Sequence, residues 1–315
     1  MRPQSCYTPP LTTREAALHY AGEIAALGTA ICWACGSNFF AAAGKRLGSW
    51  HLNRLRITAA AVLLTLSLTV VRGSPLPLWA TPSQVGWLAL SGLVGFVFGD
   101  SFYFRSLVIL GPGKAALISS LAPVFTALIA WPVLGETLGP LALVGMALTL
   151  GGVAWVVQGR MHEERRHAEG SVFVGVVAGV LSGLGQAVGY VISKLALREG
   201  LDPLSATVIR VLAATVAVWI LALFGRDVVQ SVRGLRDRTA ALTMAAGAFF
   251  GPFLGVTLSL VALKHTSAGV AASITAFYPV LTILISSKFH HEKITGRIVL
   301  GSLVSVAGVV VLFLK

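Results

Sequence analysis

A repeat that spans about half of the chain sets the strongest limit on the fold of this protein. Much of the stretch from Phe98 to Glu136, with flanking residues, recurs about 156 positions later without a gap. The matched positions include Gly95 with Gly251, Gly99 with Gly255, Pro123 with Pro279, and Glu136 with Glu292. A repeat this long indicates that the chain contains two copies of one structural unit.

The composition excludes an ordinary soluble domain. The chain is 56% hydrophobic and 11% charged, whereas roughly a quarter of a soluble domain is charged. Apolar runs of about 20 residues are long enough to cross a bilayer as helices. We therefore expect an all-α membrane protein with about ten transmembrane helices, at residues 23–43, 57–71, 85–107, 115–134, 138–157, 171–194, 204–224, 240–263, 267–288 and 295–314.

A short charged segment, residues 159–170, divides these spans into two sets of five. We expect a first repeat over residues 22–158 and a second over residues 171–314. Because five is an odd number, the second repeat must enter the membrane in the opposite sense to the first. Two inverted repeats around a central cavity are typical of secondary transporters.

The first two spans of each half match more weakly than the rest. Gly36 aligns with Gly185 and Lys45 with Lys194 at a shift of about 149, and Arg56 aligns with Arg210 at about 154. The second apolar run, residues 57–71, is short for a span unless the side chains of Arg54 and Arg56 extend to the membrane surface. The alignment pairs spans one and two with spans six and seven.

The net charge of +12 raises the question of nucleic-acid binding. Lys and Arg, however, gather in short clusters between the apolar runs, as orientation in a membrane and contact with anionic lipids require. We therefore expect membrane lipids, and no nucleic acid, as partners of these clusters. By the positive-inside rule, their distribution places both termini outside the cytoplasm.

No arrangement of residues indicates an enzyme, a metal site or a cofactor. Cys32 and Cys35 have C-x-x-C spacing, but they lie in an apolar span and no second pair completes a zinc site. His290 and His291, beside Glu292, are interpreted as part of a basic loop.

Asp100 is the first candidate for a functional residue. A carboxylate inside a span costs roughly 2.5–3.5 kcal/mol, and the repeat counterpart of Asp100 is Val256, so the fold itself does not require an acid there. Asp100 is expected to bind a cationic group or to carry a proton. Alternatively, it pairs locally with Arg105 or Lys114 and fixes helix packing.

Several other polar and aromatic residues lie at membrane depth. Each of them alone is also explained as a packing residue, but together they are expected to line a mostly apolar cavity that suits small organic solutes. The candidate substrate-binding residues are Trp33, Asn38, Asp100, Tyr103, Arg105, Gln186, Tyr190 and Tyr278.

Paired prolines and glutamates mark corresponding places in the two halves. Pro123 and Pro279 are predicted to kink the fourth and ninth spans, because each removes a backbone hydrogen bond. Such kinks either improve packing or expose carbonyls to a cavity. Glu136 and Glu292 are interpreted as caps of the helix that follows each of them. The paired glycines, such as Gly95 and Gly99, allow helices to approach closely.

The repeat and its motifs resemble the EamA-type members of the drug/metabolite transporter superfamily. The resemblance rests on A-x-x-x-S-x-x-P-V-x-T-A at 116–127, Gly-Glu at 135–136 and Gly-Asp-x-x-Tyr-Phe at 99–104, and it extends from about residue 22 to 314. It implies a ten-helix basket that moves small metabolites by alternating access, without an ATP-binding domain. It also implies termini in the cytoplasm, opposite to the charge distribution.

These observations favour a secondary transporter in the plasma (inner) membrane. Amino acids or related compounds are the expected small-molecule substrates, and protons are a candidate coupling ion. The alternative is a membrane scaffold or lipid-handling subunit without solute flux of its own. The sequence leaves the direction of transport and the oligomeric state open.

Overall fold

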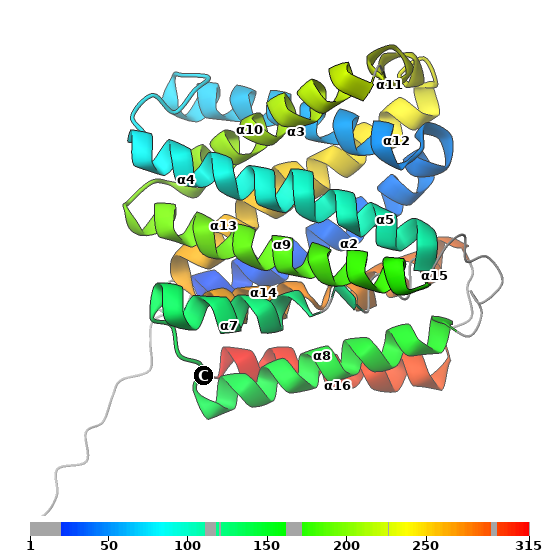
Figure 1. Ribbon diagram of the computed structural model, residues 1–315. Helices are drawn as coiled ribbons and strands as arrows, with labels where there is room; N and C mark the ends of the chain where they lie inside the picture. Colours follow the sequence, from blue (N-terminus) through cyan, green and yellow to red (C-terminus); the bar gives the residue numbers. More distant parts are fainter. Residues whose placement is uncertain are drawn as a thin grey trace, which may run out of the picture.

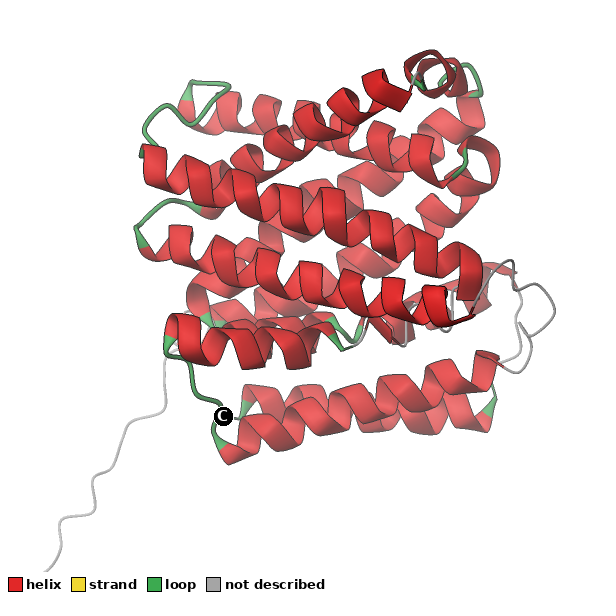
Figure 2. Cartoon of the chain, viewed as in Figure 1, coloured by secondary structure: helices red, strands yellow, loops and turns green. Residues whose placement is uncertain are grey.

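The computed structural model describes residues 20–110, 118–119, 121–161, 172–225, 227–290 and 295–314. Throughout these residues the regular structure is helical, and short loops join the helices at the two ends of the bundle (Figure 2). This confirms the expected all-α fold. The helices run across the view in Figure 1, so the loops gather at its left and right sides.

The first half of the chain forms helices α2 to α8. Their bounds are α2 Ala21–Leu47, α3 Ser49–Arg72, α4 Pro82–Gly92, η1 Leu93–Gly99, α5 Asp100–Leu110, α7 Ala122–Leu134 and α8 Pro140–Met161. The second half forms α9 Val172–Arg198, α10 Pro203–Gly225, α11 Val228–Gly234, α12 Arg238–Ala248, η2 Phe249–Gly255, α13 Val256–His265, α14 Ala268–Thr275, α15 Tyr278–His290 and α16 Gly296–Phe313.

Within the described ranges, seven helices are long and apolar enough to cross a membrane, and three shorter apolar helices accompany them. Together they correspond to the ten predicted spans. The second span differs most, because α3 begins at Ser49. The side chains of Arg54 and Arg56 do not extend to the membrane surface, because both are buried between helices. Because both guanidinium groups have hydrogen-bond partners inside the protein, α3 can begin ahead of these two arginines.

Counterpart helices of the two halves pack antiparallel to each other. On α8 and α16, Gly145 lies against Gly308 while Gly152 lies against Gly301, so the chain directions oppose (Figure 1). On α3 and α10, Thr58 accepts a hydrogen bond from Trp219, whereas Arg72, further along α3, pairs with Asp202 at the start of α10. Opposed directions in both pairs show that the two repeats are inverted.

The two halves also pack directly against each other. The first span of each half packs against the third span of the other: Gly36 on α2 lies against Gly251, and Gly185 on α9 lies against Gly99. Because glycine has no side chain, the backbones of these helices approach closely there. The central contacts of the bundle are therefore made between halves.

Two π-helical segments, η1 and η2, interrupt the third and eighth spans at corresponding places. The shift of 156 places Leu93 on Phe249 and Gly99 on Gly255, which are the bounds of the two segments. Such wide turns are uncommon and often occur at functional sites. They contain the paired glycines Gly95–Gly99 and Gly251–Gly255, which the sequence indicated only as close-packing positions.

The two paired prolines do not bend continuous helices, contrary to expectation. Pro123 lies in the first turn of α7, and Pro279 follows the first residue of α15. Ahead of α15, the backbone leaves the helix at Ala276 and Phe277. Proline is well tolerated at a helix start, where its missing N–H has no intrahelical partner to lose. Pro123 therefore lies at the start of α7, and Pro279 begins a second helix after an interruption of its span.

Replacing Gly152 by Ala is expected to destabilise the protein by about 1–3 kcal/mol, the range for overpacking a close contact. An added methyl would lie 2.6 Å from the carbonyl oxygen of Gly301 on α16. The neighbouring Gly151 faces open space, so Gly151→Ala is a matched control that is expected to be neutral or mildly stabilising, because alanine favours helix. Thermal unfolding in detergent measures both variants, and equal effects would contradict the close contact.

Candidate functional site

A buried ion pair joins α3 to the third span near the middle of the bundle. Asp100 directly follows η1 and is 8% exposed; its Oδ2 accepts from Nη2 of Arg56, which is 4% exposed. Asp100 therefore does not pair with Arg105, which points to the exposed side of α5, and Lys114 lies outside the described residues. A pair with Arg56 also argues against a free acid that binds a cationic substrate or carries a proton.

Gln186 on α9, in the second half of the chain, donates a further hydrogen bond to Asp100. Its Nε2 lies 3.0 Å from Oδ1 of Asp100 and 3.2 Å from the carbonyl oxygen of Gly95. The same carbonyl of Gly95, in the widened turn of η1, also accepts a hydrogen bond from the backbone N–H of Asp100. The π segment thus serves to hold the carboxylate and its amide partner together.

Arg56 is enclosed by further partners. Its Nε donates to Oδ1 of Asn53 at 2.8 Å, and its guanidinium carbon lies 5.2 Å from the ring centre of Phe40 and 5.4 Å from that of Phe104. Aromatic faces attract a cation electrostatically. The charge of Arg56 is therefore paired with Asp100 and lies beside two aromatic rings.

Arg210 on α10 is the repeat counterpart of Arg56, and its surroundings differ. It is 1% exposed, and its guanidinium carbon lies 5.0 Å from the ring centre of Phe96. Among the residues that the structure describes, none forms a hydrogen bond with its Nε or Nη1. The position matching Asp100 is Val256, the first residue of α13. One of two symmetry-related arginines therefore lacks a carboxylate.

Three tyrosines lie around these charges and come from both halves. The hydroxyls of Tyr103 on α5 and Tyr278 on α15 lie within interaction range of each other. Tyr190 on α9 is within range of Ser259 on α13 and of Arg210. Their hydroxyls can donate or accept hydrogen bonds.

The structure thus gathers Asp100, Tyr103, Gln186, Tyr190 and Tyr278 among the predicted residues, and we call these five with Arg56 and Arg210 the central cluster. The two arginines were not among the residues predicted to bind substrate. Their signal in the sequence was the occurrence of an arginine at matching places near the start of both second spans.

The other three predicted residues have different surroundings. Trp33 packs its ring against Gly251 and Gly255 of η2. Asn38 donates to the carbonyl of Ala34 in its own helix at 2.9 Å. Arg105 is exposed on α5. Within the described ranges, no group of three His, Cys, Asp or Glu side chains is placed to hold a metal ion.

A second polar site lies at the end of the bundle where α7 and α9 finish (left in Figure 1). A pocket of about 570 Å³ is lined there by residues of both halves, among them Glu136, Lys194 and Thr266. Lys194 Nζ lies 2.6 Å from Oε1 of Glu136 and donates to the Thr266 carbonyl. The hydroxyl of Thr266 in turn donates to Oε1 of Glu23 at 2.8 Å. We call these four residues the end network.

Glu136 caps a helix, but not the one that follows it in the chain. Its Oε2 accepts from the backbone N–H of Ala268 at 2.8 Å, at the start of α14 in the other half. The expectation that it caps the next helix, α8, is therefore wrong. A carboxylate at a helix N-terminus also interacts favourably with the helix dipole. Glu292 lies outside the described residues.

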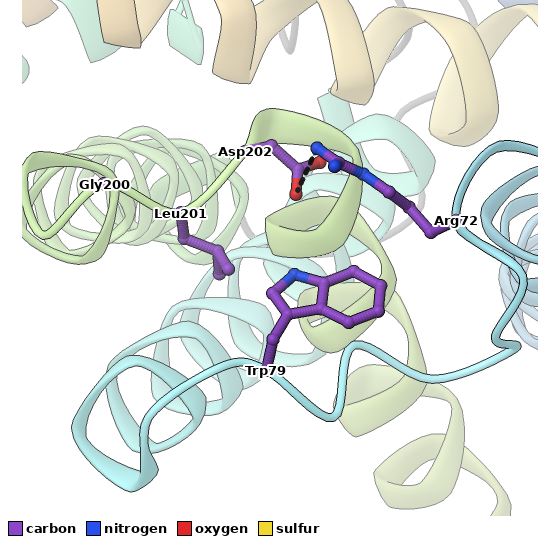
Figure 3. A pocket seen from close by; sticks show the side chains of 5 residues that line it. All are labelled: Arg72, Trp79, Gly200, Leu201 and Asp202. Atoms are coloured by element: carbon purple, nitrogen blue, oxygen red, sulfur yellow. Dashed lines mark ion pairs between the residues drawn. The ribbon is translucent and has the colours of Figure 1, made fainter.

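Arg72, Trp79 and Asp202 line a smaller pocket of about 370 Å³ at the same end (Figure 3). Oδ1 of Asp202 accepts from the Ser205 N–H at 3.0 Å, so Asp202 caps α10. Partial burial favours a higher pKa, but the hydrogen bonds from Ser205 and the charge of Arg72 outweigh it. The pKa of Asp202 therefore lies below its ordinary value.

Replacing Asp202 by Ala is expected to lower the free energy of unfolding by about 1 kcal/mol through loss of the cap. Because the folded-state pKa is lowered, this stabilisation is fully present above the unfolded-state pKa and is lost as pH falls through the folded-state value. Melting temperatures measured from pH 7 down to acid should therefore converge for the two proteins. A constant difference would exclude the carboxylate as its source.

Comparison with known proteins follows the same division into halves. The sequence matches the EamA-like transporter family over residues 20–158 and again over residues 173–314. The chain belongs to the EamA-like transporter family. Membership makes it a multi-pass membrane protein of the drug/metabolite transporter superfamily, whose members are transporters rather than enzymes.

This EamA-like transporter is 28% identical over 258 residues to an uncharacterized protein of Pseudomonas aeruginosa, covering 81% of this chain and 80% of that protein. A crystal structure of a protein superposes with a TM-score of 0.73, covering 93% of this chain and 96% of the other, at 17% identity. At that identity the likeness concerns the fold alone.

Proposed function

We propose that this EamA-like transporter is a secondary carrier of small metabolites in the plasma (inner) membrane, working by alternating access. Amino acids and related compounds are the leading substrate class. The observation that supports it is the central cluster: charged and hydroxyl groups, buried at membrane depth, contributed by both inverted repeats. Buried charges within spans are costly and characteristically mark substrate or ion pathways.

The end network supports the same proposal. It ties the end of α7 in the first half to α9 and α14 in the second, so it holds the two repeats together at one end of the bundle. Lys194 and Gln186 lie eight residues apart on α9, which is about 12 Å along a helix. In alternating access, contacts of this kind form when one end is closed and break when it opens.

Flux measurements in proteoliposomes test the proposal. Vesicles holding the full chain and an internal pH dye are given a pH gradient and a panel of amino acids, nucleobases and sugars, and radiolabelled uptake follows for solutes that move no protons. We expect saturable uptake of at least one solute that protein-free vesicles do not show. Absence of all uptake by folded protein would favour a scaffold or lipid-handling role instead.

A further inference from the structure

The inverted repeats make an internal comparison possible at the central cluster. Arg56 and Arg210 are counterparts in α3 and α10, both almost fully buried. Their environments should match if both were only structural. Instead, Arg56 is paired with Asp100, whereas a valine stands where the second carboxylate would be.

Val256 packs in the same apolar region of the bundle as the neighbours of Arg210 in the chain. Helix α10 packs directly against α13, and Val256 belongs to the same buried apolar cluster as Val208 and Val211 on either side of Arg210. No described residue forms a salt bridge with Arg210. Asp100 does attract Arg210 electrostatically, but its two oxygens accept hydrogen bonds from Arg56 and Gln186. Two arginines and one carboxylate leave the central cluster with one uncompensated positive charge.

An uncompensated buried cation is unfavourable. The ring of Phe96 offsets part of this cost, and two guanidinium nitrogens still lack acceptors. Nε and Nη1 of Arg210, the two nitrogens without acceptors, can each donate a hydrogen bond to an oxygen of an anion. The chemistry of Arg210 therefore favours an anion from outside the chain.

We propose that Arg210 binds the anionic group of the transported solute, and that this group is a carboxylate. The proposal rests on the proposed transport function and adds the substrate chemistry. A single surplus charge is neutralised by a singly charged carboxylate, whereas a phosphate monoester would leave excess negative charge. The hydroxyl of Tyr190, within range of Arg210, supplies a further hydrogen bond to the same group.

Ligand-dependent thermal stabilisation of the full chain in detergent tests the proposal, because binding to the folded state raises the melting temperature. The probes are amino acids, each paired with its amide, which lacks the carboxylate charge, together with inorganic phosphate. We expect at least one amino acid to stabilise the native protein and its amide to bind at least tenfold more weakly.

Two substitutions test the proposed interaction between Arg210 and the carboxylate of the solute. Arg210→Gln removes the cation, and Val256→Asp supplies the missing carboxylate inside the protein. Both are expected to weaken amino-acid binding at least tenfold. Val256→Asp should also raise the melting temperature without ligand, because it pairs Arg210. Val256→Asn, of the same size without the charge, is the matched control and should retain binding.

The outcomes separate this proposal from the transport function. Amino-acid binding that Val256→Asp leaves intact in a folded protein overturns the assignment of Arg210, as does binding of phosphate alone. Uptake of neutral or cationic solutes that Arg210→Gln does not affect would support transport and contradict the anion site. Arg210-dependent binding without any uptake would support the site and contradict transport.

Discussion

Replacing Asp100 by Asn is expected to lower the free energy of unfolding by about 3–5 kcal/mol, the range for breaking one partner of a buried ion pair. The variant leaves the guanidinium of Arg56 buried between α3 and the third span without its carboxylate. Solute uptake should be lost as well, since the central cluster would then hold two arginines and no carboxylate. Denaturant or thermal unfolding in detergent, with flux in proteoliposomes, measures both effects.

The double variant Arg56→Gln with Asp100→Asn shows whether the loss of stability arises from the unpaired charge of Arg56. If the cost arises from an unpaired charge, removing both charges should restore most of the stability, and the coupling energy from the four proteins gives the strength of the pair. Arg105→Gln, on the exposed side of the same helix, serves as the control and should unfold like the native protein. A stable Asp100→Asn protein that loses only its response to pH would instead support a proton carrier.

Replacing Glu136 by Gln is expected to destabilise the protein by about 3 kcal/mol. The substitution removes the carboxylate that lies 2.6 Å from Lys194 and 3.3 Å from Arg198, and weakens the cap on α14. Because Lys194 is buried, solvent compensates little for the loss. The end network would then hold the two halves less tightly at this end of the bundle.

Hydrogen exchange measures the weakening of the cap on α14 directly. The N–H of Ala268 at the start of α14 is expected to exchange faster in Glu136→Gln, because a neutral amide oxygen is a weaker acceptor than the carboxylate, while the N–H groups in the middle of α9 are unchanged. Glu199→Gln is a matched control, since Glu199 is an exposed glutamate at the same end of the bundle. Equal exchange in the two variants would contradict a cap and clamp made by Glu136.

The sequence was sufficient for the arrangement of the spans but not for the local geometry within them. Apolar runs and the in-register repeat predicted ten segments, because hydrophobicity and length alone decide what crosses a bilayer. The π turns of η1 and η2 were not predicted, since one extra residue in a turn leaves the apolar pattern unchanged. The paired prolines marked the right places, but whether a span bends or breaks depends on packing around it.

The central cluster was predicted in part. A lone acid at membrane depth identified Asp100, and polar character identified Gln186 and the tyrosines. The role of Arg56 was not predicted, because a long cationic side chain near a span end can extend outward to the membrane surface as readily as inward. Only tertiary contacts distinguish the two directions, and here Asp100 on a distant helix decides the direction of Arg56.

The difference between Asp100 and Val256 depends on the covalent joining of the two repeats. A pair of separate, identical five-helix chains with the same inverted packing would carry two arginines and two carboxylates, or no carboxylate at all. Neither assembly could present a single uncompensated cation. Once both repeats are parts of one polypeptide, each position can vary alone, so a symmetric scaffold can hold an asymmetric site.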